Sequence, residues 1–435
     1  MISQVIFSLV LIAAILLFIK NVRVISRNIN LGKDLQRNDQ PVKRWKTMLL
    51  VAIGQSKMVK RPFAGILHIF VYVGFVIINI EVLEILIDGV TGSHRVLSFL
   101  GPLYTFLITS FECLAVGVLV SCAIFLIRRN FKMVKRFWNR EITTWPRTDA
   151  NIILITEILL MCAFLTLDAS DTLIGRSMGD SAAGFPVSNM LTGMLSGASL
   201  PTLMVVERFC WWFHIVGILA FLNYIPYSKH FHILLAFPNV YYSNLNPKGE
   251  FTNLASVTRE IKLMLDPNAA ASAPPVDPNA VPERFGAKDV FDLSWKQLMD
   301  AYSCTECGRC TSSCPANQTG KLLSPRKIMM DTRDRLEEVG KNIDKNGKFI
   351  DDSKSLLNNY ILPEELWACT SCNACVQECP VDIDPLSIIV DMRRYLVMEQ
   401  SAAPQELALM LNNIENNGAP WQFPASDRLN WAATI

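Results

Sequence analysis

The chain has 435 residues, of which 51% are hydrophobic and only 18% are charged, and its formal net charge at pH 7 is +2. This balance, with no basic stripe interleaved with aromatic residues in the C-terminal half, gives no indication of nucleic-acid binding. The apolar residues are concentrated before residue 240. The composition therefore predicts a mainly α protein with a membrane-embedded N-terminal half and a soluble C-terminal half.

Five apolar stretches of about 20 residues are each long enough to cross roughly 30 Å of hydrocarbon. They cover residues 2–19, 63–87, 103–127, 152–173 and 206–236. The first has no basic start and no small-residue cleavage site, so we expect a retained helix rather than a signal peptide. Lys and Arg gather in residues 20–61 and 128–149, whereas the other two loops offer only Arg95 and Arg176. This asymmetry predicts that the N-terminus lies outside a bacterial inner (cytoplasmic) membrane and the C-terminal half in the cytoplasm.

Histidines indicate a haem site in the predicted five-helix bundle. A buried haem b needs imidazole ligands on facing helices, and His68 stands early in the second helix, level with His232. His214 and His232 are 18 residues apart, five turns of one predicted helix, which separates them by roughly 27 Å. His230 points away from that face and is expected at the interface. We therefore predict a haem b between His68 and His232; satisfied core histidines are the alternative, although polar groups in a membrane are costly.

A second haem would need a partner for His214. The second helix offers Asn79 at the matching position, and the remaining histidine is His94 in the outer loop. His94 could fold back to an outer haem or be a solvated loop residue, and both alternatives stay open.

Acidic side chains at membrane depth are candidates for proton delivery or quinone binding, because they are costly there unless paired or hydrated. We single out Glu81, Glu112 and Glu157, of which the last two lie deepest; Glu84, Asp168, Asp171 and Glu207 form the remainder of the set. A solvated interfacial position is the alternative for those near helix ends. Cys113, Cys122, Cys162 and Cys210 are interpreted as packing residues.

A segment rich in Pro, Ala and Asn at 266–282 predicts a flexible tether between the halves. Beyond it, helices are expected at 294–302, 325–339, 363–369 and 386–400. The predicted organisation is a five-helix transmembrane haem b domain at 1–240, a linker at 241–290, a cytoplasmic α-helical dicluster ferredoxin domain at 291–415 and a tail at 416–435.

Eight of the twelve cysteines fall in two copies of Cys-x2-Cys-x2-Cys-x3-Cys-Pro. The first three thiolates of each copy share one loop, whereas the fourth is displaced and completes the other cluster. Zinc also binds Cys-x2-Cys pairs, but a zinc site needs four tetrahedral ligands rather than this doubled pattern. We therefore predict two [4Fe-4S] clusters with crossed ligand sets: Cys304, Cys307, Cys310 and Cys379 in one, and Cys314, Cys369, Cys372 and Cys375 in the other.

Two family resemblances follow from these motifs. The five helices with His68, His214 and His232 resemble the cytochrome b (gamma) subunit of respiratory nitrate reductase, which implies two stacked haems; the chain matches three of the four ligand positions, and Ile78 or Asn79 stands at the fourth. Fusion to the cysteine motifs is similar to the heterodisulfide-reductase-like membrane iron–sulfur oxidoreductases, including the electron-transfer-flavoprotein:menaquinone oxidoreductases. The residues that carry this second resemblance are Cys304-Thr305-Glu306-Cys307-Gly308-Arg309-Cys310, Cys314-Pro315-Ala316, Ser324-Pro325-Arg326 and Asn417-Gly418-Ala419-Pro420-Trp421 with Arg428 and Trp431.

The sequence contains no G-x-G-x-x-G after a strand and no P-loop, so no nucleotide or flavin site is predicted. We expect an electron-transfer subunit of a quinone oxidoreductase, which passes electrons from a cytoplasmic donor such as electron-transfer flavoprotein through two clusters and haem b to menaquinone. Quinol-driven reduction of a cytoplasmic acceptor is one alternative, and a non-catalytic redox sensor or scaffold is another.

In the related oxidoreductases the Asn-Gly-x-Pro-Trp segment leads into cysteine-rich CCG modules, and no CCG motif occurs before Ile435. The resemblance therefore implies a separate CCG-type iron–sulfur protein docked on residues 290–435. The tail at 416–435, apolar at Trp421, Phe423 and Trp431, is expected to contribute to that contact. Packing of the tail on its own domain is the alternative.

Overall fold

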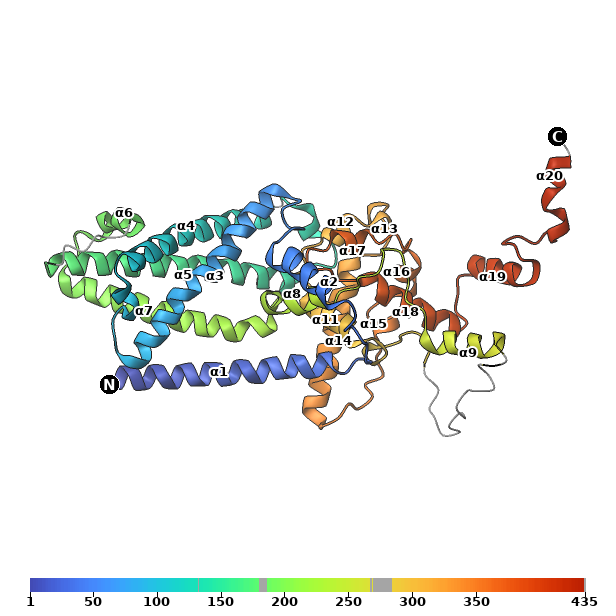
Figure 1. The fold of residues 1–435 in the computed structure, drawn as a ribbon, viewed down its shortest axis with the longest axis horizontal. Helices are drawn as coiled ribbons and strands as arrows, with labels where there is room; N and C mark the ends of the chain where they lie inside the picture. The colour runs from blue at the N-terminus through green and yellow to red at the C-terminus, as the bar shows by residue number, and fades with distance from the viewer. Residues whose placement is uncertain (132, 180–185, 267, 269–283, 434–435) are drawn as a thin grey trace.

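The structure is a computed structural model that describes residues 1–131, 133–179, 186–266, 268 and 284–433. Over these residues the chain is built from helices, with only isolated bridges between extended segments. Figure 1 shows an elongated molecule, with a bundle of long helices at one end and a cluster of short helices at the other. The predicted mainly α fold is confirmed.

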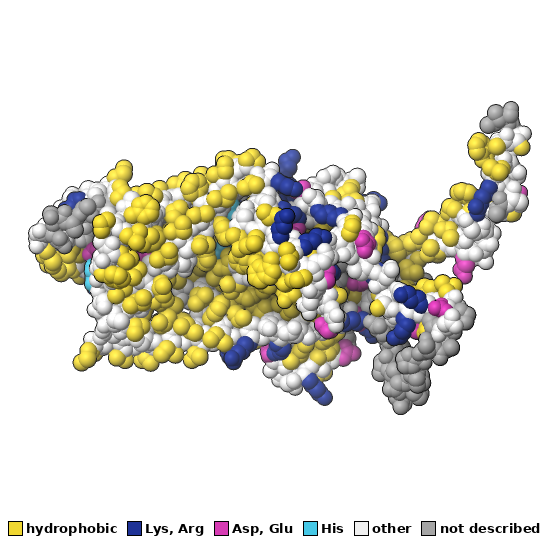
Figure 2. All heavy atoms as spheres, viewed as in Figure 1, with side chains coloured by type: hydrophobic (Ala, Val, Ile, Leu, Met, Phe, Trp, Pro, Cys, Tyr) yellow, Lys and Arg dark blue, Asp and Glu magenta, His cyan; other side chains and the backbone are white. Residues whose placement is uncertain are grey.

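The bundle consists of five helices that are long and apolar enough to cross a membrane. They are α1 (Ile2–Ile29), α3 (Pro62–Thr91), α4 (Pro102–Asn130), α5 (Thr144–Ser177) and α7 (Leu200–Tyr224). Helix α5 is central, since it packs against both α4 and α7. Apolar side chains cover the outside of the bundle (Figure 2), as expected of a surface that meets lipid. The prediction of five membrane-spanning helices is confirmed.

The last membrane helix is shorter than predicted. The expectation of one helix through residues 206–236 is wrong, because α7 ends at Tyr224 and the chain turns before the next helix begins. Pro226 has no N–H to continue the helical ladder, and Ser228 is extended, with φ −116° and ψ 152°. The elements after α7 are η4 (Ile225–Tyr227), η5 (Lys229–Phe231) and α8 (His232–Tyr241). His214 and His232 therefore do not lie on one straight helix, and the predicted axial separation between them does not apply.

Shorter elements connect the long helices on both sides of the bundle. They are α2 (Pro41–Met48), the π-helix η1 (Leu49–Ile53), η2 (Val96–Leu100), η3 (Lys135–Trp138) and α6 (Pro186–Leu195). Helix α9 (Ala255–Leu265) lies within the predicted linker. The tether predicted at 266–282 lies outside the described residues except for Asp266 and Asn268.

The C-terminal domain is organised by three helices, α11 (Trp295–Ser303), α14 (Pro325–Asn346) and α18 (Pro385–Met398), close to three of the helices expected from the sequence. Ser294 begins α11 with a capping box in which Gln297 returns the contact. The remaining elements are η6 (Val290–Asp292), α12 (Arg309–Ser312), α13 (Pro315–Gln318), α15 (Leu356–Asn359), α16 (Pro363–Trp367) and α17 (Ala374–Glu378). Ala287 and Val290 are already buried in this domain, so its packed core begins before residue 291.

The two halves share one hydrophobic core. Ile25 of α1 and Phe221 of α7 belong to the same buried cluster as Leu298 of α11 and Leu336 of α14. Polar contacts join the same elements: the Asn28 side-chain amide donates to the Tyr302 hydroxyl at 3.0 Å. The C-terminal domain is therefore packed directly on the bundle and is not held by the linker alone.

The C-terminal segment extends away from the rest of the molecule (Figure 1). It consists of α19 (Gln405–Asn417), η7 (Ala425–Leu429) and α20 (Asn430–Ala433). Trp421 and Phe423 are 49% and 65% exposed. Docking of this tail on a partner stays a prediction.

Candidate redox centres

The two cysteine loops have the same backbone. In the first loop Glu306 and Gly308 take positive φ values of 55° and 68°, and in the second Ser371 and Asn373 take 56° and 60° at the matching positions. Left-handed residues at these places curl the chain and turn backbone N–H groups inward. The Ser371 N–H, for example, lies 3.4 Å from the Cys369 sulfur, to which it donates. The identical cysteine spacing therefore folds into two equivalent thiol-lined loops.

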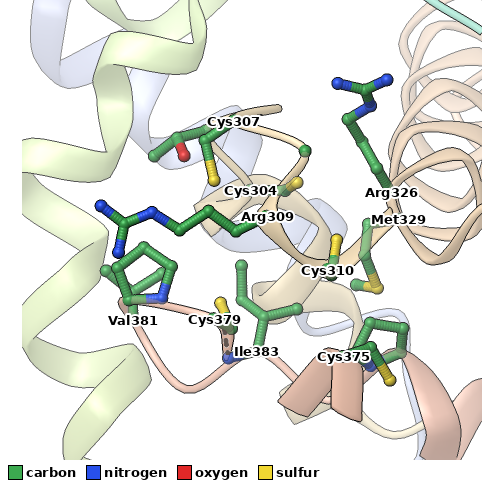
Figure 3. A pocket seen from close by; sticks show the side chains of 14 residues that line it. Cys304, Cys307, Arg309, Cys310, Arg326, Met329, Cys375, Cys379, Val381 and Ile383 are labelled. Atoms are coloured by element: carbon green, nitrogen blue, oxygen red, sulfur yellow. Dashed lines mark hydrogen bonds between the residues drawn. The ribbon is translucent and has the colours of Figure 1, made fainter. Parts of the chain in front are cut away.

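Five motif cysteines line a single pocket, three from the first motif and two from the second: Cys304, Cys307, Cys310, Cys375 and Cys379. Figure 3 shows the sulfurs of Cys304, Cys307, Cys310 and Cys379 facing a common space, while the sulfur of Cys375 points away. We call this the proximal pocket. The structure thus brings together the four cysteines that the sequence grouped across the two motifs.

The other four cysteines form a second group. Burial raises the pKa of the Cys369 thiol, and the charges of Cys314 and Cys372 add to this effect. Burial likewise raises the pKa of Cys375, which has Cys369 and Cys314 as charged neighbours. Cys314 and Cys375 of this distal group are buried, but Cys372 is exposed, whereas none of the four cysteines grouped in the proximal pocket is exposed.

The donor set suits iron–sulfur clusters. Burial raises the pKa of Cys304 to about 11 and places that of Cys310 well above its usual value. Buried thiolates are costly without a cation, and iron would supply that charge. Among the described residues no three His, Cys, Asp or Glu side chains converge closely on one point; the thiols instead surround a space. Two clusters would each supply a one-electron carrier, held by the two cysteine groups.

Basic side chains place the proximal pocket against the bundle. The Arg136 Nε donates to the Cys307 carbonyl at 2.7 Å, and Lys57 Nζ donates to the Cys379 carbonyl at 3.2 Å. Arg309, between the cysteines, donates to the Lys57 carbonyl at 3.0 Å. The basic loops that predict the topology therefore also hold the cysteine loops in position.

Arg326 fixes the far wall of the same pocket. Its side chain is fully buried and donates to the Arg136 carbonyl at 2.8 Å and to Glu141 Oε1 at 2.6 Å. A Cβ on Gly308 would come within 2.3 Å of its guanidinium, so only glycine fits there without displacing Arg326. The Ser-Pro-Arg segment thus positions the first cysteine loop.

Three histidines gather at the end of the bundle next to the proximal pocket. The rings of His230 and His232 have centroids 5.6 Å apart. Burial, together with the neighbouring His232 and His68, lowers the pKa of His230 to about 3. Arg309, which lines the proximal pocket, is in turn a charged neighbour of His68. The structure therefore brings His68 and His232 to one place, as predicted, although by a different chain path.

The hydrogen bonds of these rings fit haem ligation. His232 Nδ1 lies 3.0 Å from the Lys229 carbonyl, and because a carbonyl only accepts, Nδ1 carries the proton. The lone pair of Nε2 is then available to an iron, in the arrangement usual for metal-bound histidine. His68 Nδ1 is buried and has no hydrogen-bond partner among the described residues. A haem b held by His68 and His232 would supply a one-electron carrier here.

His214 and His94 are not brought together. His214 is 1% exposed, with Nδ1 3.0 Å from the Leu160 carbonyl, and its ring lies against Phe164. The His94 side chain is 61% exposed, and its Nε2 lies 3.6 Å from Asp171 Oδ1. His94 therefore lies among the surface groups at the end of the bundle, and the structure supports the solvated-loop alternative for it.

The membrane acids singled out from the sequence differ in whether they have hydrogen-bond partners. Glu112 is fully buried and accepts from the backbone N–H groups of Val187 and Ser188 at 3.0 and 3.1 Å, so it caps α6. Glu157 is half-buried. Glu81 is 6% exposed, and its Oε2 has no hydrogen-bond partner among the described residues. Of the three acids singled out from the sequence, Glu112 thus has a structural partner.

Two basic residues with structural contacts were not predicted from the sequence. Arg95 was used only to predict the orientation in the membrane, yet its side chain donates to Asp171 at 2.7 Å and to Asp168 at 2.9 Å. Lys229 has no predicted role, yet it pairs with Glu306 of the first cysteine loop. A basic residue in an otherwise uncharged outer loop, and a lysine next to a candidate haem ligand, were the available signals.

Comparison with known proteins supports the cluster assignment. A domain family described as "4Fe-4S dicluster domain" matches residues 303–383, which contain all eight motif cysteines. The chain therefore contains a 4Fe-4S dicluster domain, and the prediction of iron–sulfur clusters is confirmed. No solved structure matches the chain.

Two curated relatives match almost the whole chain. A probable iron-sulfur-binding oxidoreductase of Bacillus subtilis (strain 168) is 28% identical over 99% of the chain, and the EtfAB:quinone oxidoreductase of Syntrophomonas wolfei subsp. wolfei is 25% identical over 92%. The chain spans 60% and 55% of their respective lengths.

A third relative matches the cluster segment. It is a component of the ferredoxin/F420H2-dependent CoB-CoM heterodisulfide reductase of Methanosarcina acetivorans, and it is 33% identical over 27% of the chain and 60% of its own length. The predicted resemblance to heterodisulfide-reductase-like iron–sulfur oxidoreductases is confirmed. Together the relatives support an electron-transfer role for the chain as part of an oxidoreductase.

Proposed function

We propose that the chain is the membrane-anchored electron-transfer subunit of a quinone oxidoreductase, which carries electrons from a cytoplasmic donor to menaquinone. The observation that carries this proposal is the position of the proximal pocket. It lies against the bundle, and Arg309 is shared between its wall and the surroundings of His68. Electrons that reach this pocket are thus next to the candidate haem ligands of the membrane half.

The two cysteine groups suggest that electrons pass from the surface of the C-terminal domain toward the membrane bundle. Cys372 of the distal group is exposed, whereas Cys304 and Cys379 of the proximal pocket are buried. A soluble donor can therefore approach the distal group, and the proximal group relays electrons inward. With the basic loops in the cytoplasm and the N-terminus outside a bacterial inner membrane, this donor is cytoplasmic.

We propose electron-transfer flavoprotein as the donor, acting through a separate CCG-type iron–sulfur protein. The support is the similarity to a relative whose name states EtfAB as one redox partner and quinone as the other. The exposed apolar side chains of Trp421 and Phe423 give the tail a surface suited to such a contact.

Quinol-driven reduction of a cytoplasmic acceptor is the second candidate, in which the same carriers run in reverse. The similarity of the cluster segment to a heterodisulfide reductase component favours it. The two directions use the same residues and differ only in which partner is oxidised.

Redox spectroscopy of the full chain in lipid nanodiscs tests the proposal. After reduction of the clusters by dithionite, we expect a low-spin haem b spectrum, and addition of a menaquinone analogue should reoxidise both haem and clusters. The Cys113→Ser variant, which changes an exposed cysteine outside both motifs, serves as a control and should behave as the unmodified chain. A purified chain that holds iron–sulfur clusters but neither binds haem nor is oxidised by quinone would contradict the proposal and favour a redox sensor.

A further inference from the structure

A second pocket lies at the boundary between the bundle and the cytoplasmic domain, beside the first cysteine loop. Its cavity volume is about 80 Å³, so it can hold the edge of one ring rather than enclose a whole ligand. The bundle supplies Trp145, Asp149 and Tyr227, and the cytoplasmic domain supplies Glu306, Arg333 and Glu337. We call it the boundary pocket. Its lining includes none of the motif cysteines and no histidine.

The boundary pocket lies level with the cytoplasmic ends of two membrane helices. Asp149 stands in the second turn of α5, and Tyr227 follows the end of α7. Trp145 and Tyr227 are 51% and 64% exposed at this level. Large amphipathic rings are typical where lipid headgroups meet hydrocarbon. A lipid-soluble molecule with a polar ring can therefore reach the pocket from the bilayer.

Lys229 provides a hydrogen-bond donor inside this pocket. Its side chain is 9% exposed, and its ammonium donates to Glu306 Oε2 and to the Pro146 carbonyl. The third acceptor, Asp149 Oδ2, is 3.7 Å away, too far for a hydrogen bond. An ammonium has three N–H groups, so one of them can donate to an oxygen of a molecule in the pocket.

The same lysine links the pocket to both candidate redox centres. Glu306, the ion-pair partner of Lys229, lies between Cys304 and Cys307 in the sequence. The backbone carbonyl of Lys229 accepts the hydrogen bond from His232 Nδ1. A ligand in the boundary pocket would thus touch residues adjacent to a cluster ligand and to a haem ligand.

Protons can reach the pocket from the cytoplasm. Asp334 lines it, and its side chain is 55% exposed. Glu337 is half-buried, and burial raises the pKa of its carboxyl, so it holds a proton more readily than a solvated carboxyl does.

We propose that the boundary pocket binds the headgroup of a quinone, with Lys229 donating a hydrogen bond to one of its carbonyl oxygens. This inference rests on the proposed function and assigns the site at which the electrons are transferred to quinone. Reduction forms two O–H bonds on the quinone. Two electrons arrive singly from the iron–sulfur and haem centres, which are oxidised, and two protons arrive from the cytoplasm through Glu337 and Asp334. No group leaves, and the product is the hydroquinone.

Photo-crosslinking of the unmodified chain tests the location. The chain in nanodiscs is illuminated with an azido-1,4-naphthoquinone, and labelled peptides are identified by mass spectrometry. We expect label in the peptides that contain Trp145, Tyr227 or Tyr302, and we expect unlabelled menadione to prevent it. Label confined to the helices that carry Glu81 or Glu157, or label that menadione does not prevent, overturns the proposal.

Kinetics of two matched variants test the role of Lys229. Lys229→Met removes a charged hydrogen-bond donor, so the KM for the quinone analogue should rise about tenfold to a hundredfold, with both clusters retained by paramagnetic resonance. Arg27→Met removes another ion pair between the two halves, with Asp344, outside this pocket, and should change that KM by less than about twofold. Equal rises in both variants mean that Lys229 acts only through docking and overturn the proposal.

The outcomes also separate this inference from the proposed function. If the unmodified chain reduces no quinone, the proposed function fails. If it reduces quinone and Lys229→Met retains an unchanged KM, only the boundary pocket assignment fails. Should Lys229→Met fail to assemble, the crosslinking of the unmodified chain decides.

Discussion

The two ends of the membrane bundle contain the same kinds of costly groups but use them differently. At the end that meets the C-terminal domain, His68, His230 and His232 gather beside a cysteine-lined pocket, and His68 Nδ1 has no hydrogen-bond partner among the described residues. At the opposite end, Arg95 engages Asp168 and Asp171 with close contacts, while Glu81 Oε2 and Asp168 Oδ2 also have no hydrogen-bond partner among the described residues. An unpartnered polar atom in the bundle therefore indicates a redox site only where thiols or imidazoles gather around it.

The largest expected effect concerns the cysteine groups. Cys379→Ser should destroy the cluster whose other ligands are Cys304, Cys307 and Cys310, because the four thiols surround one pocket. Iron content should fall from about eight atoms per chain to about four, and one of two paramagnetic signals should vanish. Cys113→Ser is the control and should retain all the iron. Retention of both signals in Cys379→Ser would refute the crossed ligand sets.

The next largest effect distinguishes, by haem content, the histidines at the two ends of the bundle. His68→Ala and His232→Ala should each abolish the same low-spin haem spectrum, since either change leaves one axial position of the iron empty. His94→Ala should leave the optical spectrum unchanged, because its side chain is 61% exposed. His214→Ala then decides whether a further haem is present, through the loss or retention of a second component. If His94→Ala removed a haem, the assignment of this residue to the solvated surface would be wrong.

The smallest effect concerns stability at the outer end. Arg95→Leu leaves the fully buried Asp168 without its ion pair, and the free energy of unfolding should fall by about 3–5 kcal/mol. Arg208→Leu is the matched control, because the pair with Glu207 is 3.5 Å long and Arg208 is 58% exposed; about 0–1 kcal/mol is expected. Thermal unfolding in detergent measures both, and haem and cluster spectra should be unchanged in each. A loss of haem in Arg95→Leu would give this end a functional role.

Much of this architecture follows from local patterns. Hydrophobic length is sufficient to predict the five spans, and the cysteine spacing determines the loop geometry because both copies place left-handed residues at the same positions. The break after α7 was missed, since apolar residues continue through Pro226 and the hydropathy of a segment does not register a proline. Lys229 and Glu306 were missed for a different reason. They are distant in sequence, and only the docking of the cytoplasmic domain on the bundle brings them together.

The hydrophobic core shared by the two halves determines whether the cluster-binding domain can fold when it is separated from the bundle. The dicluster domain match covers residues 303–383. The hydroxyl of Tyr302, however, accepts a hydrogen bond from Asn28, 274 residues earlier. Leu298 is buried in a hydrophobic cluster that also contains residues of α1 and α7. A fragment cut at the linker would carry every motif cysteine and yet expose an apolar face. The smallest unit expected to fold when it is fused to another electron-transfer protein is therefore the bundle together with the cysteine loops.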